Sequence, residues 1–89
     1  MANSSQFTMA ANTVKQLSVS PTNDELCSLY GLYKQATIGN INIEKPKFYQ
    51  IKDIAKWDSW NNNKGLSVYD AEVNYIKYVN ILIKKYKKY

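Results

Sequence analysis

The sequence predicts a single all-α domain built from four helices. The chain has 89 residues, which is the length of one domain. Its 45% hydrophobic and 21% charged residues are typical of a globular chain and not of a disordered one. Four segments space their apolar residues three and four apart, as one face of a helix requires, and no segment reads as a strand. We therefore expect helices at about 5–17, 23–38, 53–64 and 67–86.

The first two helices have recognisable boundaries. The apolar face of the first comprises Phe7, Ala10, Ala11, Val14 and Leu17. Pro21 pushes Ser20 away from helical angles and so ends this stretch. The second helix can be capped by Thr22 or Asn23, and Gly39 offers a left-handed stop at its end.

Residues 40–51 show no helical period, and Pro46 interrupts them. The large apolar residues of this segment are Ile41, Ile43, Phe48, Tyr49 and Ile51. Because a loop of this length in so small a domain usually has a function or packs on itself, we expect an ordered loop with these side chains packed. The third helix follows, with Trp57 and Trp60 expected mainly in the core and Gly65 as its stop.

The fourth helix is expected to begin at Ser67, whose hydroxyl can cap the first turn, with Asp70 three residues on. Its apolar face comprises Val68, Ala71, Tyr75, Val79, Leu82 and Tyr86. We expect the two terminal helices to pack together, the first through Phe7, Ala11, Val14 and Leu17 and the fourth through Tyr75, Ile76, Val79 and Leu82.

Missing residue types exclude several kinds of chemistry. The chain has no His, which excludes a histidine general base, a Ser-His-Asp or Cys-His pair and a histidine metal ligand. The single cysteine, Cys27, cannot form an internal disulfide and behaves as a small hydrophobic residue without an activating base. No catalytic residue or metal site is therefore predicted. No membrane span is predicted either, because no apolar run approaches the roughly 20 residues that one requires.

The net charge of +5 is concentrated at the C-terminus. Four of the twelve lysines are Lys84, Lys85, Lys87 and Lys88, and the rest of the chain has eight lysines against seven acidic residues. The favoured interpretation is a solvated helix end, where cations complement the helix dipole. Contact with an anionic membrane surface or with nucleic acid is the alternative.

One face of the second helix carries the informative polar residues. Tyr30, Tyr33 and Lys34 are spaced three and four apart and continue an apolar stripe. Lys56 on the third helix and Tyr75 on the fourth also fall near inward-facing positions. Together they indicate a partly apolar groove with an anion-binding site at one end. The alternative is that lysine stems and tyrosine tips simply reach solvent from the edge of the core.

Two motifs carry a family resemblance. Residues 33–42 read YKQATIGNIN and residues 55–60 read AKWDSW. These stretches resemble the two signatures of the acyl-CoA-binding protein family, and the resemblance covers almost the whole chain. It implies an up-down-down-up four-helix bundle over residues 1–89. It further implies a non-catalytic carrier of one medium- or long-chain fatty acyl-CoA ester. The single cysteine, with no signal-peptide pattern at the N-terminus, separately predicts a cytoplasmic monomer. Because the chain begins with Met and matches the family throughout, a fused enzyme is not expected.

The resemblance also implies roles for single residues at the CoA end. Tyr33 would stack on adenine, and Lys34 and Lys56 would pair with the 3′-phosphate as point charges. Tyr30 would donate its hydroxyl to that phosphate, and Lys15 would reach the same region.

Further roles concern the acyl chain and the helix packing. Tyr75 would contact the ligand while packing against the first helix. The acyl groove would be lined by Ala10, Leu26, Cys27 and Leu29. Asn40 stands where the family commonly has Asp, and we expect a small electrostatic effect from this change.

A competing interpretation is a basic helical module that binds nucleic acid or protein, suggested by the many lysines and tyrosines. The carrier interpretation predicts no cofactor beyond the acyl-CoA ligand, no nucleic-acid partner and no stable membrane insertion. It leaves the lysine-rich C-terminus as a candidate for transient membrane contact.

Overall fold

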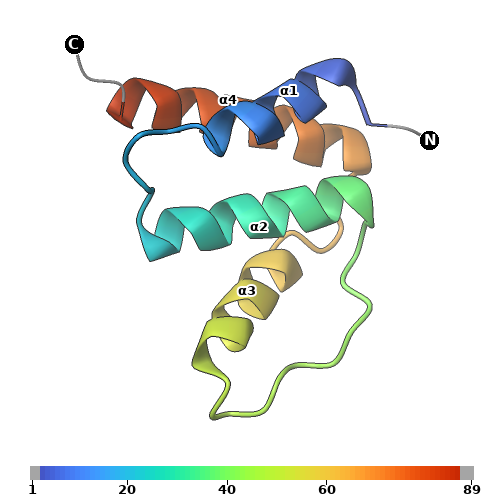
Figure 1. Cartoon of the computed structure of the whole chain (residues 1–89). Coiled ribbons are helices and arrows are strands. Elements are labelled where there is room, and N and C mark those ends of the chain that lie inside the picture. The colour runs from blue at the N-terminus through green and yellow to red at the C-terminus, as the bar shows by residue number, and fades with distance from the viewer. Residues whose placement is uncertain (1–2, 87–89) are drawn as a thin grey trace.

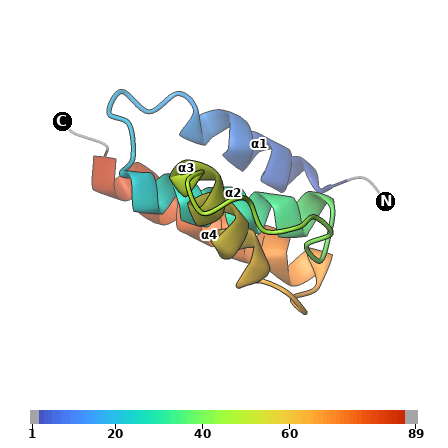
Figure 2. The ribbon, with the colours of Figure 1, turned by 90° about the horizontal axis from the view of Figure 1, so that it is seen from below.

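The computed structural model describes residues 3–86 and places four helices in them (Figure 1). The helices are α1 (Ser5–Val14), α2 (Asn23–Thr37), α3 (Ile51–Asn61) and α4 (Val68–Tyr86). α1 packs on α4, α4 on α2, and α2 on α3. α1 and α4 run in the same direction, α2 runs opposite to both, and α3 crosses α2 at a steep angle (Figures 1 and 2). The predicted all-α, four-helix fold is confirmed.

The core lies where α1, α2 and α4 meet. Its buried residues are Phe7, Ala10, Leu29, Ala36, Ala71, Tyr75, Val79 and Leu82. Ala11, Val14 and Ile76 are partly buried against them, so the predicted contact between the terminal helices is present. Leu17 lies beyond the end of α1 and is only partly buried.

Side-chain caps fix the starts of α2 and α4. The Thr22 hydroxyl accepts a hydrogen bond from the Glu25 N–H (3.2 Å), and the Glu25 carboxylate accepts one from the Thr22 N–H (2.9 Å). This reciprocal capping box satisfies two backbone donors that the helix itself cannot. The Ser67 hydroxyl accepts from the Asp70 N–H (3.0 Å) at the start of α4. The caps predicted at Thr22 and Ser67 are therefore present.

Two helices, α1 and α3, have bounds that differ by two or three residues from the predicted ones. α1 ends at Val14 and not near residue 17, because the Gln16 N–H donates to the Thr13 carbonyl only three residues back. α3 runs from Ile51 to Asn61, whereas residues 53–64 were expected. Beyond it, the N–H groups of residues 63, 64 and 66 also bond carbonyls three residues back. Such bonds tighten the turn and end a regular α-helix.

The loop between α2 and α3 is ordered, but the expectation that its apolar side chains pack is wrong. Phe48 is 88% exposed, Ile51 76% and Tyr49 67%, and Ile43 is exposed as well. Only Ile41 is partly buried. The loop passes outside the core, so its side chains find no apolar partners there.

Indole groups of α3 hold this loop by its backbone instead. Trp60 is almost fully buried, and its Nε1–H donates to the Gly39 carbonyl (2.8 Å). Trp57 is half-buried, and its Nε1–H donates to the Ile43 carbonyl (3.0 Å). Both tryptophans thus combine packing with a hydrogen bond that satisfies a loop carbonyl.

A buried amide joins the same loop to the turn before α4. Gln35 is fully buried, and its Nε2 donates to the Asn40 Oδ1 (3.0 Å) and the Leu66 carbonyl (2.7 Å). The Gly65 N–H donates to the same Asn40 Oδ1 (2.8 Å). Asn40 is therefore a structural acceptor that links two loops, a role that its position in the sequence did not reveal.

Candidate functional site

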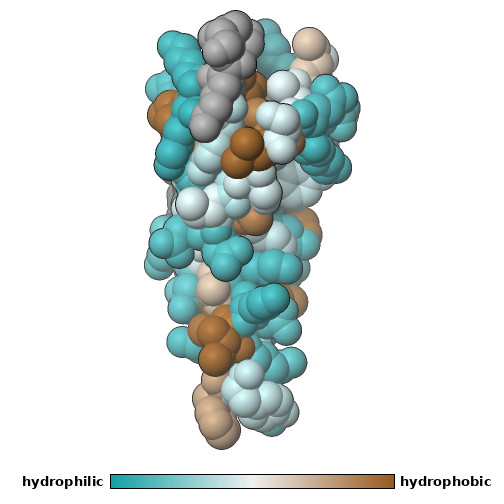
Figure 3. Space-filling model, turned by 60° about the vertical axis from the view of Figure 1, so that its left-hand side comes forward, coloured by the Kyte–Doolittle hydropathy of each residue, from teal (hydrophilic) through white to brown (hydrophobic). Residues whose placement is uncertain are grey.

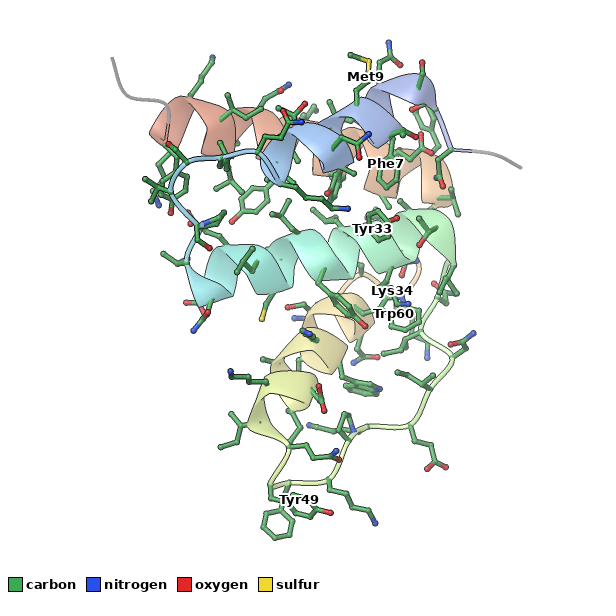
Figure 4. The ribbon with its side chains drawn as sticks, viewed as in Figure 1. Phe7, Met9, Tyr33, Lys34, Tyr49 and Trp60 are labelled. Atoms are coloured by element: carbon green, nitrogen blue, oxygen red, sulfur yellow. The ribbon has the colours of Figure 1, made fainter. Side chains whose placement is uncertain are left out.

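Two ammonium groups flank one phenol ring where α3 crosses α2. The Nζ of Lys34 lies 5.9 Å from the centroid of the Tyr30 ring, and the Nζ of Lys56 lies 5.6 Å from it. Lys34 is one helical turn after Tyr30 on α2, while Lys56 arrives from α3. The Lys34 Nζ also lies 5.1 Å from the Trp60 ring, and Figure 4 shows these two side chains together. The crossing of the helices therefore concentrates positive charge around Tyr30.

These charges are available to an anion. Within residues 3–86, the ion pairs are Lys45–Asp58 and Lys85–Glu25, and neither includes Lys34 or Lys56. A bound phosphate group could accept charge-assisted hydrogen bonds from both ammonium groups.

An apolar groove opens beside this cationic pair, between the first half of α2 and α3. Its volume is about 330 Å³. Leu26, Cys27, Ile51 and Ala55 form its apolar lining, and Lys56 lines the end nearest Tyr30. A second hollow of about 300 Å³ includes both Tyr30 and Lys56. Lys56 therefore borders both spaces and also belongs to the cationic pair.

The residues predicted to line an acyl groove separate into two sets. Leu26 and Cys27 line the groove between α2 and α3, and Leu26 keeps much of its side chain exposed. Leu29 and Ala10 are instead buried in the core. Ile51 and Ala55 line the groove although they were not among the residues predicted for it. Ala55 was detectable, since it opens the AKWDSW motif.

Three aromatic rings form a cluster next to the site. Tyr33 stacks on Phe7 with centroids 5.5 Å apart, and Figure 4 shows the two rings facing each other from α2 and α1. Tyr75 lies 4.9 Å from Phe7 and 5.9 Å from Tyr33. Tyr33 is 41% exposed, whereas Tyr75 is only 4% exposed. Tyr33 can therefore offer ring surface to a ligand, while Tyr75 mainly joins three helices.

Burial raises the pKa of Tyr75, and the neighbouring Tyr33 adds to this effect. The Tyr75 hydroxyl therefore stays protonated over the physiological range.

Lys15 belongs to a different element from the two lysines of the cationic pair. It is exposed at the C-terminal end of α1 and makes none of the contacts that join Lys34 and Lys56 to Tyr30. In the C-terminal group of lysines, the Lys85 Nζ is paired with the Glu25 carboxylate (2.7 Å). Lys87 and Lys88 lie outside the described residues.

Two further observations concern residues 3–86 only. None of the helices in that range is long and apolar enough to cross a membrane. Cysteine and acidic side chains in the same range do not gather in threes at a place that could hold a metal ion.

The fold and the site together define a small helical ligand-binding protein, one whose site can hold an anionic group at one end and an apolar chain at the other. The chain belongs to the acyl-CoA-binding protein family, since the family model "Acyl CoA binding protein" matches residues 4–79. The resemblance of the YKQATIGNIN and AKWDSW motifs to this family is thereby confirmed.

Relatives and solved structures agree with this membership. The chain is 50% identical over 80 residues to Acyl-CoA-binding protein 2 of Saccharomyces pastorianus, covering 90% of this chain and 92% of that protein. It is 48% identical to Acyl-CoA-binding protein homolog 1 of Caenorhabditis elegans, with 90% and 93% covered. Among solved structures it resembles Oryza sativa Acyl-CoA-Binding Protein 2, with a TM-score of 0.85, 36% identity and 90% and 87% of the two chains covered. ACBP from Moniliophthora perniciosa gives a TM-score of 0.88 at 31% identity, with 98% and 86% covered.

Proposed function

We propose that this protein is a non-catalytic carrier that binds one medium- or long-chain fatty acyl-CoA ester. The observation that carries the proposal is the position of Lys56, which borders both the apolar groove and the ring of Tyr30. A ligand with a phosphate at one end and a hydrocarbon chain at the other would fill both parts of such a site. Family membership over residues 4–79 supports the same ligand.

At the CoA end, Lys34 and Lys56 would hold the 3′-phosphate between them, and the Tyr30 hydroxyl would donate a third hydrogen bond. The exposed ring surface of Tyr33 would stack on adenine. Lys15 and Tyr75 would contribute from α1 and α4, Lys15 as a third cation that reaches the phosphate region and Tyr75 as a contact to the ligand.

At the acyl end, the chain would lie against Leu26, Cys27, Ile51 and Ala55. Each buried CH₂ group contributes about 0.8 kcal/mol, so affinity should rise with chain length until the groove is full. Leu29, on the same helix as Leu26, would support this surface from the core behind it, whereas Ala10 lies on α1, which packs on α4.

The wider setting is part of the same proposal. Residues 1–89 would act as one acyl-CoA-binding domain, a monomer in the cytoplasm that requires no cofactor and no nucleic-acid partner. The alternative of a basic module for nucleic acid or protein is not supported, because the chain belongs to a family of acyl-CoA-binding proteins.

Native mass spectrometry of freshly purified protein tests the proposal, followed by calorimetric titration with palmitoyl-CoA, free CoA and palmitate. We expect one palmitoyl-CoA to bind per chain and free CoA to bind much more weakly. Palmitate should also bind more weakly than palmitoyl-CoA, because it lacks the phosphate contacts. Failure of palmitoyl-CoA to bind would refute the carrier function, and binding of oligonucleotides with a steep salt dependence would favour the alternative.

A further inference from the structure

Two of the three most exposed aromatic side chains of the described residues lie side by side on the turn that precedes α3. Phe48 and Tyr49 are 88% and 67% exposed, and their rings form a T-shaped pair with centroids 5.5 Å apart. Ile51 is 76% exposed two residues later. Figure 3 shows hydrophobic side chains gathered at this lower end of the molecule, and Figure 4 shows Tyr49 pointing away from the fold. We call Phe48, Tyr49 and Ile51 the apolar tip.

The local backbone holds the apolar tip outward. The Gln50 N–H donates to the Lys47 carbonyl (2.8 Å), and the Gln50 side-chain oxygen accepts from the Lys47 N–H (3.0 Å). These two bonds close a turn whose central residues are Phe48 and Tyr49, so both rings are displayed at its apex. The exposure is therefore built into an ordered turn.

The residues that directly flank the apolar tip in the sequence are both lysines, which suits an anionic partner. Lys47 precedes Phe48 directly, and Lys52 follows Ile51 directly. Residues 43–53 contain three lysines and two acidic residues, Glu44 and Asp53. The third lysine, Lys45, is paired with Asp58 (3.7 Å). Lys47 and Lys52 are next to the tip in the sequence, and Glu44 and Asp53 lie further out.

We propose that the apolar tip docks on the surface of an anionic phospholipid bilayer. A convex turn that combines aromatic and aliphatic side chains with flanking lysines fits the boundary between headgroups and acyl chains, where rings insert and ammonium groups contact phosphates. The protruding shape fits a bilayer better than a protein partner, which would offer it a matching pocket only if one were built for it.

Docking at this place would also orient the ligand groove. Ile51 belongs to the apolar tip and lines the groove, and Lys52 borders both. The groove opening would therefore face the bilayer, which would let an acyl chain pass between them. This last step rests on the proposed carrier function, whereas the docking itself does not.

The test is vesicle flotation of the full chain without acyl-CoA. Vesicles of phosphatidylcholine alone are compared with vesicles that also contain phosphatidylserine. The variant Phe48→Ser/Tyr49→Ser removes two exposed rings and leaves every charge in place. Its control, Met9→Ser/Tyr69→Ser, removes two other exposed apolar side chains, from α1 and α4, that are 66% and 73% exposed.

We expect wild type and control to bind the anionic vesicles equally, and the Phe48→Ser/Tyr49→Ser variant to bind about tenfold more weakly. A Phe48→Trp variant should keep wild-type binding, and its emission should shift to the blue on the vesicles. If the wild type and all variants bound anionic vesicles equally, the proposal would be overturned, and electrostatic attraction of the lysines would explain the binding. Failure of the wild-type chain to bind anionic vesicles would also overturn the proposal. If the wild-type chain then dimerised as its concentration rose, the apolar tip would be an interface with a second copy of this chain.

Calorimetry with palmitoyl-CoA separates this proposal from the carrier function. Phe48 and Tyr49 do not line the groove, so their removal should leave palmitoyl-CoA binding unchanged. If the wild-type chain bound vesicles but not palmitoyl-CoA, the proposed carrier function would be refuted and the proposed membrane docking would stand.

Discussion

Gly31 of α2 touches the backbone of Ser59 on α3 so closely that no side chain fits between them. A Cβ atom at residue 31 would lie 2.5 Å from both the carbonyl carbon and the carbonyl oxygen of Ser59. The close approach lets α3 cross directly on α2, and the ligand groove lies between these same helices.

The variant Gly31→Ala should therefore destabilise the protein by about 1–3 kcal/mol, because the backbone of α3 has to move. Intrinsic helix propensity alone predicts the opposite sign, since Ala stabilises a helix interior by up to about 1 kcal/mol over Gly. The free energy of unfolding of the Gly31→Ala variant, measured by denaturant unfolding, decides between these two predictions. Ser28→Ala, at an exposed position of the same helix, should be neutral or slightly stabilising, and a more stable Gly31→Ala variant would contradict the close contact.

The Asn40 junction gives a second stability prediction. Asn40→Ala removes the acceptor shared by the Gln35 side chain and the Gly65 N–H, and should cost about 1–2 kcal/mol in thermal or chemical unfolding. Asn40→Asp keeps an oxygen at the same place and should unfold close to wild type. If both variants lost equal stability, the amide nitrogen of Asn40 and not its oxygen would be responsible.

Much of the fold could be predicted because its signals are local. The caps at Thr22 and Ser67 and the periodic apolar faces of α2 and α4 lie within a few residues of the structure that they specify. The contact of Gly31 with Ser59 gave no such signal, since it depends on how two helices cross. The exposure of Phe48 was missed for a related reason, because an apolar residue does not reveal whether the fold provides it with a partner.

The same distinction applies to the candidate site. Tyr30 and Lys34 lie on one face of a single helix, so their spacing placed them together. Lys56 joined them only through the family motif, because its position depends on the crossing of α3. Leu26 and Leu29 share one apolar stripe, yet the first faces the groove and the second the core. The width of a stripe does not show where the core ends and a groove begins.

Lys34→Ala should weaken binding of all acyl-CoA esters by about ten- to a hundredfold, whatever their chain length, because it would remove the charge-assisted contact proposed for the phosphate. Calorimetric titration with octanoyl-, dodecanoyl- and palmitoyl-CoA measures this factor. Lys77→Ala, at an exposed position of α4, is the matched control and should bind like wild type. An effect that disappears for the longest chain would rule out the assigned role of Lys34.

Tyr75→Ala should reduce stability as well as binding. Its ring contacts Phe7 and Tyr33 and is almost fully buried, so truncation should cost about 3–5 kcal/mol. Thermal unfolding gives the stability, and titration of the remaining folded protein gives the affinity. Tyr75→Phe keeps the ring and should restore the stability, while exposed Tyr69→Ala should change little. Unchanged thermal stability in Tyr75→Ala would contradict the packing role.

Glu25 makes the contact between the start of α2 and the end of α4 sensitive to acid. Its carboxylate accepts hydrogen bonds from the Lys85 ammonium, the Tyr86 hydroxyl and the Thr22 N–H. These contacts, with Lys85 first, lower the pKa of Glu25 from 4.5 to about 2. Because the folded state holds the charged form more tightly, this contribution is fully present above the ordinary pKa and is lost as pH falls toward 2.

Glu25→Gln should therefore unfold at lower denaturant than wild type at about pH 6, and the difference should shrink by about pH 3. Urea midpoints across this range measure it. Some acid sensitivity should remain in the variant, because the Asn3 amide also lowers the pKa of Glu72. The exposed loop variant Glu44→Gln should follow the wild-type curve. If the Glu25→Gln deficit stayed constant over the whole range, titration of Glu25 could not be the source of the acid sensitivity.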